Sequence, residues 1–348
     1  MSGPVVSVDG DVIRYSIGCV CDTDIFVAYD GDTNLGVFPN VTALKMKLGE
    51  DAMTKYKIKR KVAAEPVEFA LHSCKMKLEY IRQATNARKL VVYLTGSGNF
   101  REHLNLCLPY KGNRVTKKEA KAMKESGAYP HFFEQYPNKF GKGKPTHFHA
   151  LTDYMVNRFD AIIIDDMEVD DKLAMEQVRA WNWSTDPDKL REEGHIVSSV
   201  DKDLMQVPGW FFDFRPDDKR KADVPDWEFV TQEEADRNLW AQCISGDMTD
   251  NIYGVEGIAL KGAKKLIEKG IAEGKTGREI RDEAFKEWFA KMEKQIEEGK
   301  ELKPVSRHIF NNYTAEEYAQ EVFDLVYLRR DMEDLNEIQE KINQDRNS

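Results

Sequence analysis

Acidic side chains recur in this sequence at the points where short, apolar, β-branched runs end. The three runs concerned are residues 5–8, 161–164 and 195–199. The acids that follow them are, in chain order, Asp9, then Glu168, Asp170 and Asp171, then Asp201 and Asp203. In an open parallel sheet the carboxyl ends of the strands meet along one edge, where ligands bind. We therefore expect these side chains to converge on one site.

A further acidic pair, Asp247 and Asp250, lies in a glycine-punctuated segment that begins at residue 246. Eight carboxylates gathered in one place repel each other unless divalent cations neutralise them. A ligand set of oxygens without His or Cys selects Mg²⁺ or Mn²⁺ over zinc. Such a cluster suits hydrolysis of a phosphodiester by two metal ions about 3.5–4 Å apart. Each acid taken singly more often caps a helix or closes a turn, so the prediction depends on the joint pattern.

The elements that must position these acids alternate along the chain. Residues 89–94 form a fourth short apolar run of the strand type. Helical periodicity lies between the runs, at residues 67–83, 146–158 and 170–181. Strands that alternate with helices predict an α/β fold with a central, mostly parallel sheet flanked by helices. Continuous apolar runs of this length are typical of strands that are buried on both faces.

The chain is expected to divide near residue 245. Residues 1–245 contain the alternating elements and form the predicted core, in which a basic region at about residues 111–150 interrupts the alternation. This region is predicted to be a partly helical excursion over the sheet. Residues 246–348 are predicted to be mainly helical. The last two helices, expected at 315–330 and 331–344, are rich in charge and are predicted to lie at the periphery.

The net charge of −10 hides an uneven distribution of charge. Between residues 111 and 144, Lys and Arg number nine against three Glu. A second basic cluster spans residues 55–61. Because salt screens charges beyond about 10 Å, the local charge decides whether a surface attracts phosphates. Phosphate binding and two merely solvated basic surfaces both remain open on charge alone.

Length and composition exclude several classes of protein. The 348 residues, 41% hydrophobic and 32% charged, are typical of a globular chain. No apolar run approaches the ~18 residues that a membrane span needs, and the N-terminus lacks the pattern of a secretory signal. Five scattered cysteines favour reduced thiols in a cytoplasm over a disulfide framework. No membrane partner is expected.

A short glycine-containing turn is predicted between two helices at residues 254–257. The amides of Gly254 and Gly257, next to a helix N-terminus, could bind a phosphate without reading sequence. Lys261, Lys264 and Lys265 on the following helix would add positive charge. The alternative is a plain joint in which the glycines only permit the turn. The position directly behind two of the clustered acids favours the phosphate site.

The chain also carries five stretches in an order and spacing typical of one protein family. They are V-D-G-D at 8–11, F-R-E-H-L-N-L-C-L-P-Y-K-G-N-R at 100–114, E-V-D-D at 168–171, S-V-D-K-D-L-M-Q at 199–206 and G-D-M-T-D-N-I-Y-G-V-E-G-I at 246–258. Together they resemble the 5′-nuclease superfamily, which includes flap endonucleases and 5′→3′ exonucleases, and the exonucleases of tailed phages look most alike. The resemblance covers roughly residues 5–270.

The resemblance implies a role for each of the acids. The site nearer the catalytic centre would use Asp9, Glu168, Asp170 and Asp171, completed or bridged by Asp201 and Asp203, while the second metal site would use Asp247 and Asp250. Lys111 and Arg114 would grip the scissile phosphate and stabilise charge that develops in the transition state. Substrate contacts are implied at Tyr110, which would stack on the terminal base, and at Arg101, Gly254, Gly257 and Lys261.

The implied activity is hydrolysis of DNA near 5′ ends with two Mg²⁺ ions, which Mn²⁺ can replace. Implied substrates are DNA with 5′ ends, flaps or gaps, and RNA–DNA hybrids through an RNase H activity. The implied setting is replication, primer removal or recombination beside a replicative polymerase, in the cytoplasm of an infected bacterium. The basic region becomes a helical arch, and residues 247–268 become a helix–three-turn–helix that binds duplex DNA.

Two other functions remain open, and two positions depart from the family pattern. The chain could be a catalytically silent, structure-specific DNA-binding protein, or a ribonuclease of the related smaller fold, which lacks a segment such as residues 246–270. Thr95 stands near a position where the family usually has Asp, which leaves the ligand set open. Ala259 replaces a usual Gly of the duplex-binding turn.

Overall fold

A central sheet carries the fold, and the computed structural model describes residues 3–104, 106–141, 143–215 and 227–347. In the order in which they hydrogen-bond, its strands are β6 (Ile162–Ile164), β5 (Lys89–Thr95), β1 (Val5–Asp9), β7 (His195–Ser198), β8 (Gly209–Phe212) and β9 (Trp227–Val230). Every neighbouring pair is parallel except β8 and β9. The predicted α/β class and the four predicted strands are therefore confirmed. Strands β8 and β9 were not predicted.

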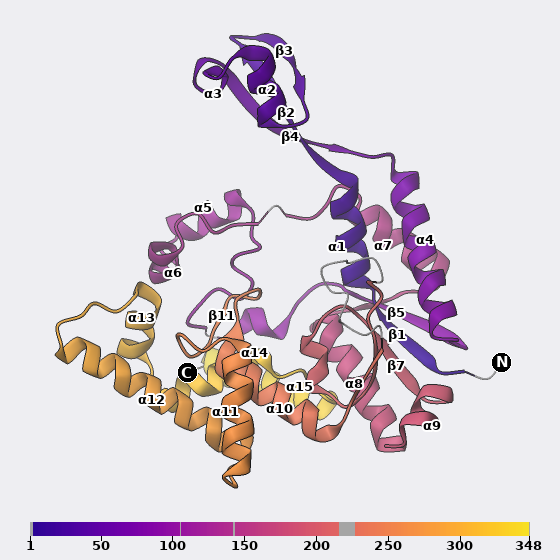
Figure 1. The fold of residues 1–348 in the computed structure, drawn as a ribbon, viewed down its shortest axis with the longest axis vertical. Helices are drawn as coiled ribbons and strands as arrows, with labels where there is room; N and C mark the ends of the chain where they lie inside the picture. The colour runs from indigo at the N-terminus through magenta and orange to yellow at the C-terminus, as the bar shows by residue number, and fades with distance from the viewer. Residues whose placement is uncertain (1–2, 105, 142, 216–226, 348) are drawn as a thin grey trace.

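Helices cover both faces of this sheet (Figure 1). One face is covered by α1 (Gly10–Cys21), α4 (Val67–Ala84) and α7 (Phe148–Phe159), and the other by α8 (Val169–Trp183) and α10 (Gln232–Ser245). Side chains alternate along β1, so that Val6 and Val8 face the first group and are fully buried. Burial on both faces explains the continuous apolar runs in the sequence. The predicted helices at 67–83, 146–158 and 170–181 are confirmed within about two residues.

The basic region forms two helices, α5 (Lys117–Glu125) and α6 (Pro130–Gln135), after a short turn η1 (Phe100–His103). Phe132 of α6 is fully buried in the cluster of side chains that also contains Val305 and Ile309 of α13 (Pro304–Asn312). The region therefore packs on the C-terminal helices, and the prediction that it lies over the sheet is wrong. Lys142 of this region lies outside the described residues.

The C-terminal part is helical, as predicted, apart from a two-stranded ribbon. The ribbon is β10 (Gly246–Asp247) with β11 (Ile252–Tyr253), and the helices that follow are α11 (Leu260–Ala272), α12 (Gly277–Glu297), α13, α14 (Ala315–Val326) and α15 (Met332–Asn347). Helix α14 does not lie at the periphery, because Tyr318 and Val322 are 1% exposed. Its apolar residues recur every three to four positions and form a stripe along one side of the helix. The composition of the segment, which is rich in charge, does not reveal this stripe. No described helix is long and apolar enough to cross a bilayer.

One buried cluster joins residues 106–133 to residues 239–326, on both sides of the expected boundary near residue 245. The division into two domains stays a prediction. Two further short elements are α9 (Pro187–Glu192) and the turn η2 (Asp203–Gln206).

A small subdomain, absent from the sequence-based expectations, projects from the end of α1 and is called the head below. It comprises β2 (Asp22–Asp30), β3 (Thr33–Phe38), β4 (Lys57–Ala64), α2 (Val41–Leu48) and α3 (Ala52–Lys55). Its three strands are antiparallel in the order β3-β2-β4. Figure 1 shows it standing apart from the rest of the chain at the top of the view, joined through β2 and β4. Its own core is small and centres on Ala28, Leu44 and Ala52.

Candidate metal centre

Asp9 lies at the carboxyl end of β1 and also caps α1. Its Oδ1 accepts a hydrogen bond from the Val12 amide at 3.0 Å, and its Oδ2 accepts one from Ser199 Oγ at 2.8 Å. The residue is 2% exposed. Burial, and then the nearby charge of Asp11, raise the pKa of Asp9 to about 7. The helix cap and the metal-ligand role do not exclude each other, because each carboxylate oxygen has a second lone pair.

Asp170 lies in the first turn of α8, which follows β6, the strand next to β5. Among the described residues, none donates a hydrogen bond to its carboxylate. Burial raises the pKa of Asp170 well above its usual value, and the neighbouring charges of Asp9, Asp201 and Glu168 raise it further. A largely buried carboxylate that lacks a hydrogen-bond donor and lies among other acids is a position that favours a cation.

A second group of acids surrounds Asp203, at the start of η2. Burial, and then the charges of Asp201, Asp247 and Asp250, raise the pKa of Asp203 to about 8. Asp170 and Asp203 also line one hollow, so the two groups of carboxylates are adjacent, and the charge of Asp201 raises the pKa of both residues. The structure therefore brings together acids that follow β1, β6 and β7 and acids from the β10–β11 ribbon, as the topology argument predicts.

Two cations lie among these acids. Lys111 Nζ forms an ion pair with Glu168 and lies 3.6 Å from Asp250 Oδ2. Arg114 pairs with Asp250 and has a half-exposed side chain. Burial lowers the pKa of Lys111, but Glu168 and Asp250 outweigh it and the net shift is upward, so the ammonium stays charged. Lys111 also has a left-handed backbone, with φ of 52°, held by a 2.8 Å hydrogen bond from its amide to the Asp250 carbonyl. Strained backbone of this kind gathers at functional sites.

A hollow of about 30 Å³ lies within this cluster. Its polar lining includes Tyr110, Glu168, Asp170, Asp203, Asp247 and Asp250. That volume holds one or two water-sized particles. The lining is rich in carboxylate oxygens, so the residues present fit hard divalent cations such as Mg²⁺.

The structure does not support the expected roles of Asp171 and Arg101. Asp171 is fully buried, and both its carboxylate oxygens accept hydrogen bonds from Arg101, at 2.6 and 3.0 Å. The Arg329 amide donates a third hydrogen bond to it at 2.9 Å. Arg101 is itself 1% exposed and also donates to the carbonyls of Leu325 and Tyr327. Asp171 is therefore a partner of arginine rather than a free metal ligand, and Arg101 positions the C-terminal segment rather than touching substrate.

Two further expected substrate contacts have structural roles instead. The Tyr110 hydroxyl lies 3.0 Å from Glu168 Oε2 and 3.1 Å from Asp250 Oδ2, and can donate to one of them. In this position Tyr110 orients carboxylates and does not offer a free ring to a base. Gly254 is buried, and a Cβ there would overlap backbone atoms of Ser245 and Gly246. Its missing side chain thus permits close packing of the ribbon, and Gly254 is not at the surface where a phosphate could reach it.

The rest of the glycine-containing turn is accessible. Gly257 is exposed with φ of 89°, and no atom lies within 4 Å of the point where a Cβ would stand. Ala259 is the N-cap of α11 and provides no side-chain cap. Lys261 is exposed in the first turn of this helix. Helix termini without a side-chain cap present free amides to anions.

Thr95 and Asp11 serve the framework beside the cluster. Thr95 Oγ1 accepts a hydrogen bond from the Val169 amide at 3.1 Å, and its amide donates to Asp11 Oδ1 at 3.0 Å. Asp11 also pairs with Arg14 at 2.7 Å. Thr95, at a position where the family pattern has an acid, therefore links β5 to α1 and α8 through hydrogen bonds. The position of Asp11 two residues after Asp9 could have indicated its place beside the site.

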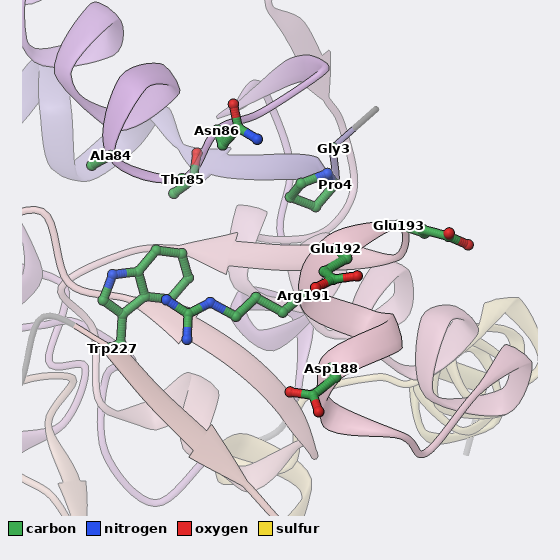
Figure 2. A pocket seen from close by; sticks show the side chains of 10 residues that line it. All are labelled: Gly3, Pro4, Ala84, Thr85, Asn86, Asp188, Arg191, Glu192, Glu193 and Trp227. Atoms are coloured by element: carbon green, nitrogen blue, oxygen red, sulfur yellow. The ribbon is translucent and has the colours of Figure 1, made fainter. Parts of the chain in front are cut away.

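Two other places in the structure could be mistaken for the site. The ligand atoms of Cys107, His131 and His308 lie within 4.8 Å of one another, but the two imidazole rings stack face to face at 3.6 Å, so their lone pairs do not converge on one point. A larger cavity of about 550 Å³ lies beside the amino ends of β1, β5 and β7 (Figure 2). Figure 2 shows Arg191 beside the ring of Trp227, with Asp188 and Glu192 nearby. The Arg191 guanidinium carbon lies 4.4 Å from the centre of that ring. This cavity is at the end of the parallel strands opposite to the acids.

The fold and this site define an α/β protein with a carboxylate-lined candidate metal centre at the carboxyl edge of a mostly parallel sheet. No family model and no curated protein matches the chain. The chain is similar to a solved bacteriophage T5 flap endonuclease, in a pseudo-enzyme–product complex with DNA and metal ions, at 17% identity and a TM-score of 0.48 over 98% of each chain. It is similar to T5 5′-exonuclease with bound zinc at 17% identity and a TM-score of 0.47, again over 98% of each chain.

These solved structures are of the kind that the five sequence stretches resemble.

Proposed function

We propose that this chain is a divalent-metal-dependent nuclease that hydrolyses phosphodiester bonds of DNA near 5′ ends. The observation that carries the proposal is the single small hollow that Asp170 and Asp203 line together with Glu168, Asp247 and Asp250. So many carboxylates around one hollow favour divalent cations bound side by side, the arrangement suited to phosphodiester hydrolysis. A protein that only bound DNA would gain nothing from so many mutually repelling acids.

The ligand set consists of Asp9, Glu168, Asp170 and Asp201 on one side and Asp203, Asp247 and Asp250 on the other. Bound Mg²⁺ or Mn²⁺ would supply a nucleophilic hydroxide at neutral pH and stabilise the leaving oxygen. Asp9, the last residue of β1, and Asp170, in the first turn of α8, are the acids we assign to catalysis. Ser199, which donates to Asp9, fixes the orientation of that carboxylate.

Lys111 and Arg114 are the cations assigned to the scissile phosphate. In the structure they neutralise Glu168 and Asp250, two acids of the proposed ligand set. Both side chains become available to a phosphate once those acids are neutralised in another way. A preorganised cation of this kind stabilises negative charge that builds up in the transition state.

Duplex DNA is proposed to bind along the N-terminus of α11. The exposed Gly257 lets a phosphate approach the backbone closely, and Lys261 adds a positive charge in the first turn. The acid cluster and this turn are linked directly by the β10–β11 ribbon, which contains Asp247 and ends just before Gly254. The ribbon therefore fixes the distance between the duplex and the cutting site.

The finer features remain part of the proposal. They are the choice among 5′ ends, flaps and gaps, action on RNA of RNA–DNA hybrids, and a duty in replication, primer removal or recombination. A replicative polymerase as partner and the cytoplasm of an infected bacterium as location stay predictions.

A cleavage assay tests the proposal. The protein is incubated with 5′-labelled flap and blunt-duplex DNA, in Mg²⁺ and in EDTA, beside an Asp201→Ala/Asp203→Ala variant. Cleavage from the 5′ end that needs Mg²⁺ and is lost in the variant, while DNA binding persists, is the expected result. Product lengths then separate exonuclease from flap cutting.

The second candidate function is a structure-specific DNA-binding protein without catalysis. The observation that favours it is Thr95, which lies at the edge of the acid cluster and contributes a hydroxyl there instead of a carboxylate. Wild-type protein that binds branched DNA but does not cut it in Mg²⁺ or Mn²⁺ would establish this function and overturn the first.

A further inference from the structure

The sheet of the head has one face that α2 and α3 leave open. Alternate residues of its strands, Phe26, Ala28, Phe38 and Ile58, contact the side chains of these helices in the small core of the head. The residues between them therefore point to the opposite face. In Figure 1 the head stands apart from the rest of the chain, with no other element drawn against it.

Three lysines lie in a row on this open face. Lys57, Lys59 and Lys61 alternate along β4 and are all exposed. None of them forms an ion pair with another described residue, whereas Arg60, on the other face of the same strand, pairs with Asp24. These three lysines belong to the basic cluster at residues 55–61, and the proposed nuclease site uses none of them.

The same face carries an apolar strip with one aromatic ring. Across the strand register, the three lysines lie opposite Tyr29, Val27 and Ile25 of β2, of which Tyr29 and Ile25 are partly exposed and Val27 is buried beneath its neighbours. Lys59 Nζ lies 5.1 Å from the centre of the Tyr29 ring. On the neighbouring strand β3, Val37 is 58% exposed. No acidic residue occurs among these positions, so the face is positive along one side and apolar along the other.

This pattern fits a single nucleic acid strand. Alternate residues of a strand are about 6.8 Å apart, so the three ammonium groups span roughly 14 Å. Each interval of about 6.8 Å equals about two rises of 3.4 Å along one strand, so the three lysines match every second phosphate of a stacked single strand. Unpaired bases need an apolar or aromatic surface to stack on, while paired bases in a duplex do not. The combination favours single-stranded over duplex DNA.

We propose that this face of the head binds the single-stranded 5′ tail of the substrate. The inference rests on the proposed nuclease function. Helix α1 begins directly after Asp9 and ends directly before β2, so the base of the head lies about 18 Å from the metal centre, the length of a 12-residue helix. A tail of only a few nucleotides would reach it. The base of the head is also held to the end of the basic region, through the Thr146 amide and Asp22 Oδ2 at 2.9 Å.

The test compares two triple variants by fluorescence anisotropy in EDTA and by cleavage rate in Mg²⁺. The head variant is Lys57→Gln/Lys59→Gln/Lys61→Gln, and the control of equal charge change is Lys291→Gln/Lys294→Gln/Lys300→Gln, at exposed positions on and just after α12. Each is measured on a blunt duplex and on the same duplex with a 15-nucleotide 5′ tail.

The head variant is expected to bind the tailed DNA about tenfold more weakly than the wild type and to bind the blunt duplex equally well. Its plot of log affinity against log salt for the tailed DNA should be shallower by about 2, the value for three lost single-strand phosphate contacts. Tyr29→Leu should weaken binding of the tailed DNA about fivefold without changing that slope, because stacking is not ionic. The control variant should match the wild type on both substrates.

If the wild type cuts DNA but the head variant loses affinity equally for blunt and tailed DNA, or loses affinity for neither, the inference is overturned and the proposed function stands. A wild type that neither binds nor cuts any substrate would remove the proposed function and this inference with it. Co-sedimentation with vesicles of phosphatidylserine and phosphatidylcholine tests the alternative that this face binds a membrane surface. Vesicle binding that depends on the three lysines, without dependence on the tail, would assign the face to a membrane surface and overturn the inference.

Discussion

The guanidinium of Arg101 and the carboxylate of Asp171 form a buried bidentate ion pair, with distances of 2.6 and 3.0 Å. Arg101 belongs to η1 and Asp171 to α8, and the remaining donors of Arg101 bind carbonyls at the end of α14 and just after it. The pair therefore joins α8, beside the metal centre, to the C-terminal helices. Bidentate geometry makes such a pair strong and orientation-specific.

Removal of one member should be costly. Arg101→Met leaves the Asp171 charge buried without its main partner, and we expect it to lower the free energy of unfolding by about 3–5 kcal/mol. The double variant Arg101→Met/Asp171→Leu should lose less than the sum of the two single variants, because it leaves no unpaired charge. Urea denaturation of the four proteins measures these differences, and additive losses would contradict a direct coupling.

Lys111 should matter for catalysis far more than for DNA binding. We expect Lys111→Ala to lower the single-turnover cleavage rate in saturating Mg²⁺ by about 10²–10³-fold, since it removes a preorganised cation from the transition state. Lys89→Ala, an exposed lysine at the amino end of β5, is the matched control and should cut at the wild-type rate. A Lys111→Ala protein that binds more weakly but cuts bound DNA at full rate would reduce Lys111 to a binding residue.

Two glycines near the duplex-binding turn should respond to alanine in opposite directions. Gly254→Ala places a Cβ against the backbone of Ser245 and Gly246, so we expect a loss of about 1–3 kcal/mol of stability and a displaced β10–β11 ribbon. Gly262 lies in α11, and the nearest atom to an added Cβ is 3.6 Å away. Gly262→Ala should therefore stabilise by about 0.5–1 kcal/mol. Thermal unfolding of both variants checks the pair, and shifts of the same sign would contradict the packing described here.

His195 should make stability depend on pH in the acid range. Its ring is buried between Gln177 Oε1 at 2.8 Å and Ser7 Oγ at 2.7 Å, and burial lowers the pKa of His195 to about 4. Below about pH 6.5 the unfolded chain gains a proton that the folded chain does not, so the stability contributed by this site is lost as pH falls from about 6.5 to 4.

The expected loss at His195 is about 3 kcal/mol across that window. Other groups titrate there too, among them Asp9, but their contribution cancels in the difference between the wild type and His195→Gln. Urea denaturation from pH 7 to pH 4 should show this difference shrinking steadily as the pH falls. A difference that stays constant would mean that His195 titrates normally.

The sequence was sufficient to predict four of the six strands of the sheet, β1, β5, β6 and β7, and the place of the acids, for a physical reason. Buried parallel strands need continuous apolar runs, and their carboxyl ends meet at one edge, so Asp9, Asp170 and Asp201 could be expected to lie together. The sequence could not separate Asp170 from Asp171. Neighbouring residues on a helix differ by about 100° in direction, and only the packed structure shows that Asp171 faces Arg101.

The head and the buried helix α14 were missed for related reasons. In β4 the lysines alternate with Ile58 and Arg60, so the strand reads as a basic cluster rather than as an alternation of apolar and polar residues. In α14 the buried positions are spread among charged ones, and composition hides the stripe that contains Tyr318 and Val322. The buried face of each element can be recognised only in the structure, where other elements pack against it.

The most direct test of the metal centre is the initial rate of cleavage of 5′-labelled flap DNA by three proteins in Mg²⁺. They are the wild type, Asp170→Asn, and Asp160→Asn as a control at an exposed acid with a left-handed backbone that Asn tolerates. We expect the wild type and Asp160→Asn to cut equally in Mg²⁺ and neither to cut in EDTA. Asp170→Asn should bind the DNA but cut it at least about 10²-fold more slowly. Cleavage by Asp170→Asn at the wild-type rate, or cleavage by the wild type in EDTA, would contradict the assignment of catalysis to this cluster.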